Sequence, residues 1–262
     1  MSRPPGRPGP RPGSVQPSAG ARAACRPLGH DAVRLDPGNW LGAWQVLNRT
    51  ATIPHCVSEL AQSGSLDNLR RKTGEFGGPR RGMWFSDSDV YKTLEGIGWE
   101  LDSGDELRSD STALVDLVAK AQDEDGYLHS WFGLDGYEPW SDLTNGHEMY
   151  CAGHLIQAGV AAARGGGGRL LEVARRFADL LVERFRDDDG PAGRSDEGGR
   201  AAIDGHPEIE MALLNVETGT FGTVNYGYLV AGAVIAMVPC VILYLALQRY
   251  YVQGLMSGAV KG

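Results

Sequence analysis

The chain has 262 residues, enough for one or two domains, and its hydrophobic fraction of 42% and charged fraction of 22% are ordinary for a globular protein. The formal net charge of −8 argues against a nucleic-acid partner, because phosphate binding needs a basic surface. The cysteines form no CxxC pair, so we expect neither a disulfide framework nor a zinc site from them; they are Cys25, Cys56, Cys151 and Cys240.

Residues 1–30 form a Pro/Arg-rich extension. They hold five arginines, seven prolines and five glycines, and no acidic residue. Such a composition cannot build a hydrophobic core, and it lacks the apolar stretch of a secretory signal. We therefore predict a disordered arm.

Residues 31–215 form the predicted globular domain. Capping residues and apolar residues at helical spacing predict helices that begin or run at 86–101 after Ser86–Asp89, 110–121 with Asp110 as the cap, 145–165, 170–185 and from His206 onward. Short loops rich in Gly, Asp and Pro join them, without a βαβ pattern. The expected class is all-α, built of stacked helical hairpins.

Residues 216–262 form the predicted third part, in which 218–248 carry no charged side chain. The stretch 226–247 would span about 33 Å as a helix, which matches a bilayer. Tyrosines lie toward its ends, as interfacial aromatics do. We predict one transmembrane helix and hence a membrane protein. Arg249 and Lys261 favour a cytoplasmic C-terminus, yet no signal would export the globular part, so its side of the membrane stays open.

Four motifs in the globular part resemble glycoside hydrolase family 127, the β-L-arabinofuranosidase-like enzymes. In chain order they are Phe85-Ser-Asp-Ser-Asp-Val-Tyr-Lys92, Ala121-Gln-Asp-Glu-Asp-Gly-Tyr-Leu128, His147-Glu-Met-Tyr-Cys-Ala-Gly-His-Leu155 and His206-Pro-Glu-Ile-Glu210. The resemblance covers about 31–214. It implies an (α/α)6 toroid, of which this chain would hold an incomplete part, and a carbohydrate ligand of the arabinofuranoside type.

The family hydrolyses its substrate with a zinc-held cysteine thiolate and a glutamate acid/base, since a metal lowers the pKa of a thiol. By the resemblance, these residues lie beyond the matched part. We therefore expect no catalytic residue, no metal ligand and no cofactor in this chain. Half a toroid would also leave apolar faces unburied, so we expect a tendency to aggregate.

His147, Cys151 and His154 share one face of a predicted helix and could bind a metal or line a core or pocket. The metalloprotease motif HExxH fails, because Cys151 stands where the second histidine belongs. The resemblance instead makes His147 and His206 substrate-binding residues. Imidazoles suit sugar hydroxyls, since each can donate one hydrogen bond and accept another.

Two further groups of residues have competing interpretations. Four carboxylates could form a glycosidase acid/base pair, but a helix start and a turn explain them better; they are Asp87, Asp89, Asp123 and Asp125. Aromatic side chains in a turn-rich stretch could stack on a sugar or fill the core; they are Trp131, Phe132, Tyr137 and Trp140.

The tail resembles the last span of sugar ABC-transporter permeases, through residues 248–255 and 258–262 with Pro239 before them. The loop that couples such permeases to their ATPase is not found, so we expect no transport by this chain alone. The main hypothesis is a membrane-anchored, inactive fragment of a β-L-arabinofuranosidase-like hydrolase. The alternatives are a permease remnant and a non-catalytic sugar-binding module.

Overall fold

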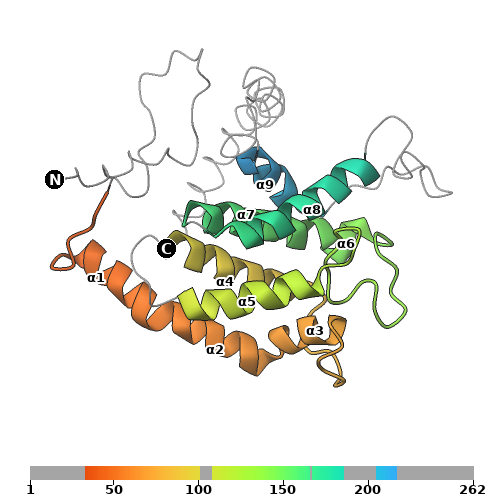
Figure 1. Cartoon of the computed structure of the whole chain (residues 1–262), viewed down its shortest axis with the longest axis horizontal. Helices are drawn as coiled ribbons and strands as arrows, with labels where there is room; N and C mark the ends of the chain where they lie inside the picture. The colour runs from red at the N-terminus through yellow and green to blue at the C-terminus, as the bar shows by residue number, and fades with distance from the viewer. Residues whose placement is uncertain (1–32, 101–107, 166, 186–204, 217–262) are drawn as a thin grey trace, which may run out of the picture. The chain divides into compact units, whose positions relative to one another are not determined.

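The computed structural model describes residues 33–100, 108–165, 167–185 and 205–216 (Figure 1). These ranges are helical, with no strand among them. The elements are α1 (Trp40–Leu47), the π-helical segment η2 (Asn48–Thr52), α2 (Ile53–Ser63), α3 (Ser65–Lys72), α4 (Asp87–Glu100), α5 (Arg108–Ala121), α6 (Leu143–Gly146), α7 (Glu148–Arg164), α8 (Gly168–Arg184) and α9 (Glu208–Val216).

Helix α7 is the centre of the described fold. It packs most extensively on α4, α8 and α9, while α2 and α5 lie against α4 and α3 (Figure 1). The contact between α4 and α7 is very close: a Cβ atom on Gly98 would lie 2.7 Å from the backbone nitrogen of Ala162. The contact of α7 with α9 depends likewise on Gly153, where a Cβ atom would meet Glu208 at 3.0 Å.

The predicted apolar stripes form the core. Each helix turns one face inward at the 3.6-residue period, and burial of these faces is the main force that stabilises the packing. The buried side chains include Val90, Leu94 and Ile97 of α4, Leu114, Leu117, Val118 and Ala121 of α5, Leu155 and Ile156 of α7, and Val173, Ala174, Phe177 and Leu181 of α8. The all-α prediction and these stripes are confirmed.

Two predicted helix starts were wrong. The helix expected from about Asn145 is divided, because His147 takes the left-handed conformation (φ 59°) between α6 and α7. Asp110 does not cap its helix, since α5 begins at Arg108. Helix ends shift by a residue or two with small changes in local hydrogen bonding, so the second error is a minor one.

The segment before residue 73 contains helices that the periodicity did not predict. Helix α1, with the sequence WLGAWQVL, is apolar on almost every side, so it has no amphipathic stripe. It is nevertheless exposed: the side chains of Trp40 and Trp44 are 68% and 69% accessible. These two tryptophans form part of an exposed apolar surface on α1.

Within the described ranges, no helix is both long and apolar enough to cross a membrane. The predicted transmembrane stretch 218–248 and the predicted disordered arm 1–30 lie outside those ranges, as does the permease-like tail. The three-part division of the chain remains a prediction.

Candidate functional site

The starts of three helices meet at one end of the fold. Phe85 lies two residues before α4, His147 immediately precedes α7, and His206 lies two residues before α9. The rings of Phe85 and His147 stack with their centroids 4.9 Å apart, and the centroids of His147 and His206 are 4.5 Å apart. Helix N-termini carry partial positive charge, so this end favours ligands rich in oxygen.

His147 is held in place by its own loop and by Trp84. The Nδ1 atom of His147 lies 2.5 Å from the carbonyl oxygen of Asn145, which also accepts a 2.8 Å hydrogen bond from Trp84 Nε1. Since a carbonyl can only accept, we assign the proton to Nδ1 of His147; the 3.4 Å approach of Trp84 Nε1 to the same nitrogen is the weaker contact. The Nε2 atom of His147 is then an acceptor in the neutral ring.

The two histidines form a complementary pair. Nε2 of His206 lies 2.9 Å from Nε2 of His147, so His206 must be the donor in this contact. Both side chains are partly exposed. The structure therefore brings together the two sequence-predicted site residues, which are 59 positions apart, with one donor and one acceptor facing each other.

Tyr150 extends the site along α7. Its ring lies edge-on to His154, with centroids 4.6 Å apart, and 5.1 Å from the ring of His206. Lys92 Nζ donates to the Tyr150 hydroxyl at 2.6 Å. Tyr150, Trp84 and Phe85 were not named as site residues; only their places inside or beside the quoted motifs could have indicated them.

The structure does not support a metal site on the α7 face. Burial and the nearby Lys92 lower the pKa of His154 to about 4, and the positive charge of Lys92 also disfavours a bound cation. His154 Nδ1 is 3.6 Å from a carboxylate oxygen of Glu208 rather than beside His147. The Cys151 thiol is fully buried and donates to the carbonyl oxygen of Phe85 at 3.6 Å. Within the described residues, no group of three or more potential ligands could hold a metal ion.

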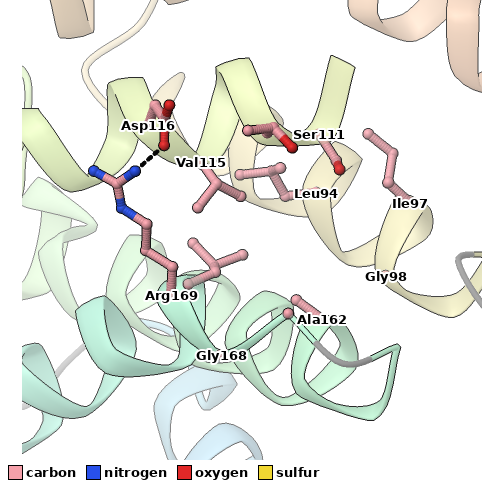
Figure 2. Close-up of a pocket in the computed structure, with 12 residues that line it drawn as sticks. Leu94, Ile97, Gly98, Ser111, Val115, Asp116, Ala162, Gly168 and Arg169 are labelled. Atoms are coloured by element: carbon pink, nitrogen blue, oxygen red, sulfur yellow. Dashed lines mark hydrogen bonds and ion pairs between the residues drawn. The ribbon is translucent and has the colours of Figure 1, made fainter. Parts of the chain in front are cut away.

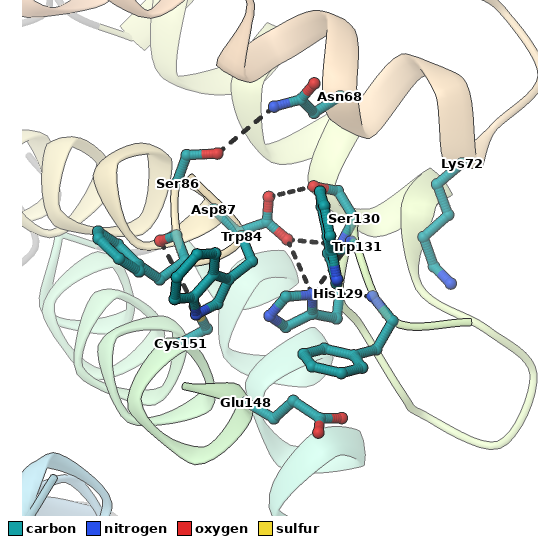
Figure 3. A network of polar contacts seen from close by, with 12 residues as sticks. Asn68, Lys72, Trp84, Ser86, Asp87, His129, Ser130, Trp131, Glu148 and Cys151 are labelled. Carbon is teal, nitrogen blue, oxygen red and sulfur yellow. Dashed lines mark hydrogen bonds and ion pairs between the residues drawn. The ribbon is translucent and has the colours of Figure 1, made fainter. Parts of the chain in front are cut away.

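A buried polar network surrounds Asp87 at the start of α4 (Figure 3). The carboxylate of Asp87 accepts a hydrogen bond from Ser130 N at 2.6 Å and another from Ser130 Oγ. His129 lies 4.0 Å from the same carboxylate, and all three residues have no exposed surface. The network ties the start of α4 to the loop that follows α5. Nothing in the sequence pattern indicated His129.

The acid/base interpretation of the four aspartates finds no support. Asp87 begins α4 as predicted, but its side chain is turned inward to Ser130. Asp123 forms an ion pair with Lys72 at 2.6 Å, and Asp125 accepts from Tyr127 N at 2.9 Å. The predicted turn at 123–126 is confirmed by the hydrogen bond from Gly126 N to Asp123 O.

The aromatic loop residues differ in burial. Phe132 is buried, and Trp140 packs against Tyr127 and Phe177 with centroids 5.0 and 6.3 Å apart. Trp131 is partly buried against the core and contacts Tyr137, which is 46% exposed. Core filling is thus observed for Phe132 and Trp140.

A separate cavity of about 230 Å³ lies toward the other end of α4 and α7 (Figure 2). Apolar side chains such as Leu94, Ile97 and Val115 line it, and an ion pair between Asp116 and Arg169 lies at one side. Most of the lining is apolar, and two of its four polar side chains, Asp116 and Arg169, are paired with each other, whereas sugars need several polar partners. The histidine pair is therefore the stronger candidate for a carbohydrate site.

The fold and the site together define an all-α domain in which two imidazoles meet at converging helix starts. The profile described as "Beta-L-arabinofuranosidase, GH127 catalytic domain" matches residues 32–226. The chain belongs to this family.

Individual relatives agree with the family assignment. The chain is 38% identical over 193 residues to the non-reducing end β-L-arabinofuranosidase of Bifidobacterium longum subsp. longum, covering 67% of this chain and 28% of that protein. The crystal structure of a GH127 β-L-arabinofuranosidase from Geobacillus stearothermophilus T6 matches with a TM-score of 0.61 and 33% identity, over 68% of this chain and 28% of that one. The chain thus spans less than a third of the relatives that it matches.

The C-terminal tail matches a different class of protein. It is 55% identical over 38 residues to the melibiose/raffinose/stachyose import permease protein MelC of Bacillus subtilis, and 53% identical over 38 residues to the arabinooligosaccharides transport system permease protein AraQ of Halalkalibacterium halodurans. Each match covers 14% of this chain and 14% of the permease. The permease-like nature of the tail is confirmed.

Proposed function

We propose that this chain contributes part of an arabinofuranoside-binding surface of the GH127 type, with His147 and His206 as its hydroxyl-binding residues. The observation that carries the proposal is their Nε2–Nε2 contact of 2.9 Å, in which one nitrogen donates and the other accepts. Both rings are partly exposed at the converging starts of α7 and α9.

A sugar hydroxyl can replace this direct contact. It would donate its proton to Nε2 of His147 and accept the N–H of His206 Nε2, so that neither nitrogen loses a partner. Tyr150 and Phe85, which flank the two imidazoles, supply ring faces for the C–H groups of a furanose. A ligand held from one side stays partly in water, so we expect weak, millimolar-range binding.

Hydrolysis by this chain alone is not part of the proposal. Burial raises the pKa of the Cys151 thiol well above its usual value, so the thiolate needed for attack is not formed there. The family's zinc chemistry does not fit Cys151 either, because its sulfur faces the Phe85 carbonyl. No reaction step is therefore assigned to the described residues.

The proposal is tested by titrating the purified chain with methyl β-L-arabinofuranoside and following ligand signals by NMR. We expect His147→Ala and His206→Ala each to weaken binding about three- to tenfold, the effect of one lost hydrogen bond. His55→Ala is the matched control, since the His55 side chain is 72% exposed on α2. Equal affinities for all four proteins would contradict the proposal, and release of nitrophenol from a chromogenic arabinofuranoside would contradict the lack of hydrolysis.

The tail suggests a second part of the proposal, that the chain is anchored in a membrane by its charge-free stretch 218–248. The permease matches support it, because import permeases are membrane proteins. Extraction of expressing cells with alkaline carbonate should leave the chain in the membrane pellet, and recovery in the supernatant would contradict anchoring.

Two alternatives remain as outcomes of these tests. A non-catalytic sugar-binding module would bind the arabinoside through the histidine pair without anchoring. A permease remnant would stay in the membrane and show no effect of either histidine substitution on sugar binding.

A further inference from the structure

The residue after His147 is a glutamate with no exposed surface. Glu148 is the first residue of α7, and its carboxylate accepts two contacts from Trp140 N, at 3.0 Å to Oε1 and 2.9 Å to Oε2. The Tyr127 hydroxyl donates to the same carboxylate. A buried carboxylate needs such partners, and hydrogen bonds to a charged group are stronger than those between neutral groups.

The segment between Trp140 and His147 has a strained residue at each end. Trp140 and His147 both take positive φ angles, 65° and 59°, which residues other than glycine rarely adopt. Such conformations cost of order 1–3 kcal/mol each and persist only where the surroundings impose them. The Glu148 carboxylate accepts hydrogen bonds from the backbone N–H of Trp140, and Glu148 directly follows His147 in the chain.

The conformation of this segment decides where the His147 ring points. Gly146 N donates to Asp142 O at 2.7 Å, and Cys151 N donates to His147 O at 2.9 Å, so His147 is the joint between α6 and α7. The Asn145 carbonyl that selects the protonated nitrogen of His147 lies in the same short segment. Releasing Trp140 would free the start of this segment.

From these contacts we propose that Glu148 is a positioning residue for the sugar site: its buried carboxylate holds Trp140–His147 in one conformation and so fixes the orientation of the His147 imidazole toward His206. The inference rests on the proposed role of His147 in sugar binding. The carboxylate of Glu148 contacts Tyr127 and Trp140, so its effect on His147 passes through the chain.

The surroundings of Glu148 match this role. Arg184 of α8 lies over the Trp140 ring, 5.6 Å from its centroid, and attracts the carboxylate, while Asp142 at the start of α6 repels it. Tyr127 is itself anchored, with its ring 5.7 Å from that of Phe177. The two donors to the carboxylate, Tyr127 and Trp140, are therefore both packed against the core.

The test substitutes Glu148→Gln, which keeps the shape but turns one of the two acceptor oxygens into a donor facing N–H and O–H groups. Glu138→Gln is the matched control, since Glu138 is exposed in the same loop. The full chain is studied in detergent at pH 8, where the Glu148 carboxyl of the parent is ionised.

Two readouts need no ligand. In Glu148→Gln we expect faster amide exchange at 140–147, with exchange in α4 and α8 unchanged, and altered ¹⁵N signals of the His147 ring. A purely structural role would speed exchange throughout the fold and leave the ring signals of the folded protein as they were, which would overturn the proposal. Tyr127→Phe, which removes a single donor, should give the same changes at smaller size and serves if Glu148→Gln does not fold.

Binding separates this inference from the proposed function. For methyl β-L-arabinofuranoside, Glu148→Gln should weaken binding about three- to tenfold, with Glu138→Gln unchanged. If the parent chain does not bind the sugar, the proposed function fails, while the exchange and ring signals still decide whether Glu148 positions His147. If the parent binds and Glu148→Gln binds equally well, the positioning role is wrong.

Discussion

Replacing His129 by asparagine is expected to remove much of the loss of stability on acidification. Burial lowers the pKa of His129 to about 4 from 6.5; the attraction of Asp87 opposes this shift, and Arg80 and Lys72 add smaller repulsions that support it. The neutral ring accepts a hydrogen bond from Trp131 N at 3.1 Å, a role that the Asn Oδ1 atom can take over.

Proton linkage determines whether stability rises or falls with pH. Between pH 6.5 and 4 the unfolded chain binds a proton at this histidine and the folded chain does not, so stability falls as the pH falls. The gap between 6.5 and about 4 corresponds to about 3 kcal/mol. His129→Asn lacks this dependence, although it loses about 1–2 kcal/mol at neutral pH because the shorter side chain leaves a small cavity.

Glu148 provides the opposing control. Burial raises its pKa to about 7 from 4.5, so the folded state keeps a proton there and stability falls as the pH rises through this window. Glu148→Gln should therefore steepen the acid loss that His129→Asn flattens. The pKa of His154 is also lowered to about 4. Because its side chain is partly exposed, His154 contributes less than His129 to the change of stability with pH.

The assay is urea unfolding of the detergent-solubilised chain at several pH values from 4 to 7.5, followed by tryptophan fluorescence. The quantity compared is the change in unfolding free energy with pH, not its value at one pH. If His129→Asn shows the same pH dependence as the parent, the buried neutral histidine is not the cause and the linkage reasoning is refuted.

Three further outcomes are expected. Gly98→Ala should destabilise the fold by about 1–3 kcal/mol in urea unfolding, because its methyl group would meet the α7 backbone at 2.7 Å. Gly96→Ala in the same helix has open space around the new methyl group and should stabilise the fold by about 0.5–1 kcal/mol. Equal effects of the two substitutions would contradict the close packing of α4 on α7. Brief treatment of the native chain with iodoacetamide should label the exposed Cys56 but not the buried Cys151, as peptide mass spectrometry can check, and early labelling of Cys151 would show that the α7 face opens. Trp44→Ser on the exposed α1 should reduce light scattering of concentrated protein, and unchanged scattering would place the aggregating surface elsewhere.

Local periodicity accounts for most of what could be predicted. The stripes of α4 and α8 were visible because an amphipathic helix repeats its apolar residues along the sequence itself. Helix α1 carries apolar residues on nearly all sides, so it has no such signal. The break at His147 was missed because a non-glycine residue adopts positive φ only when surrounding contacts impose it. The contacts of the His147 ring with Trp84 and His206 join residues that lie 63 and 59 positions apart.

The sequence by itself determined the helical class, the family and the charge-free stretch in the tail, because composition, motif order and periodicity are properties of the chain read in one dimension. Only the tertiary structure decided that His147 meets His206 and that His129 and Glu148 are buried beside their partners. The physical reason is that hydrogen-bond geometry and desolvation depend on which residues from distant segments come together, and neither spacing nor composition records that.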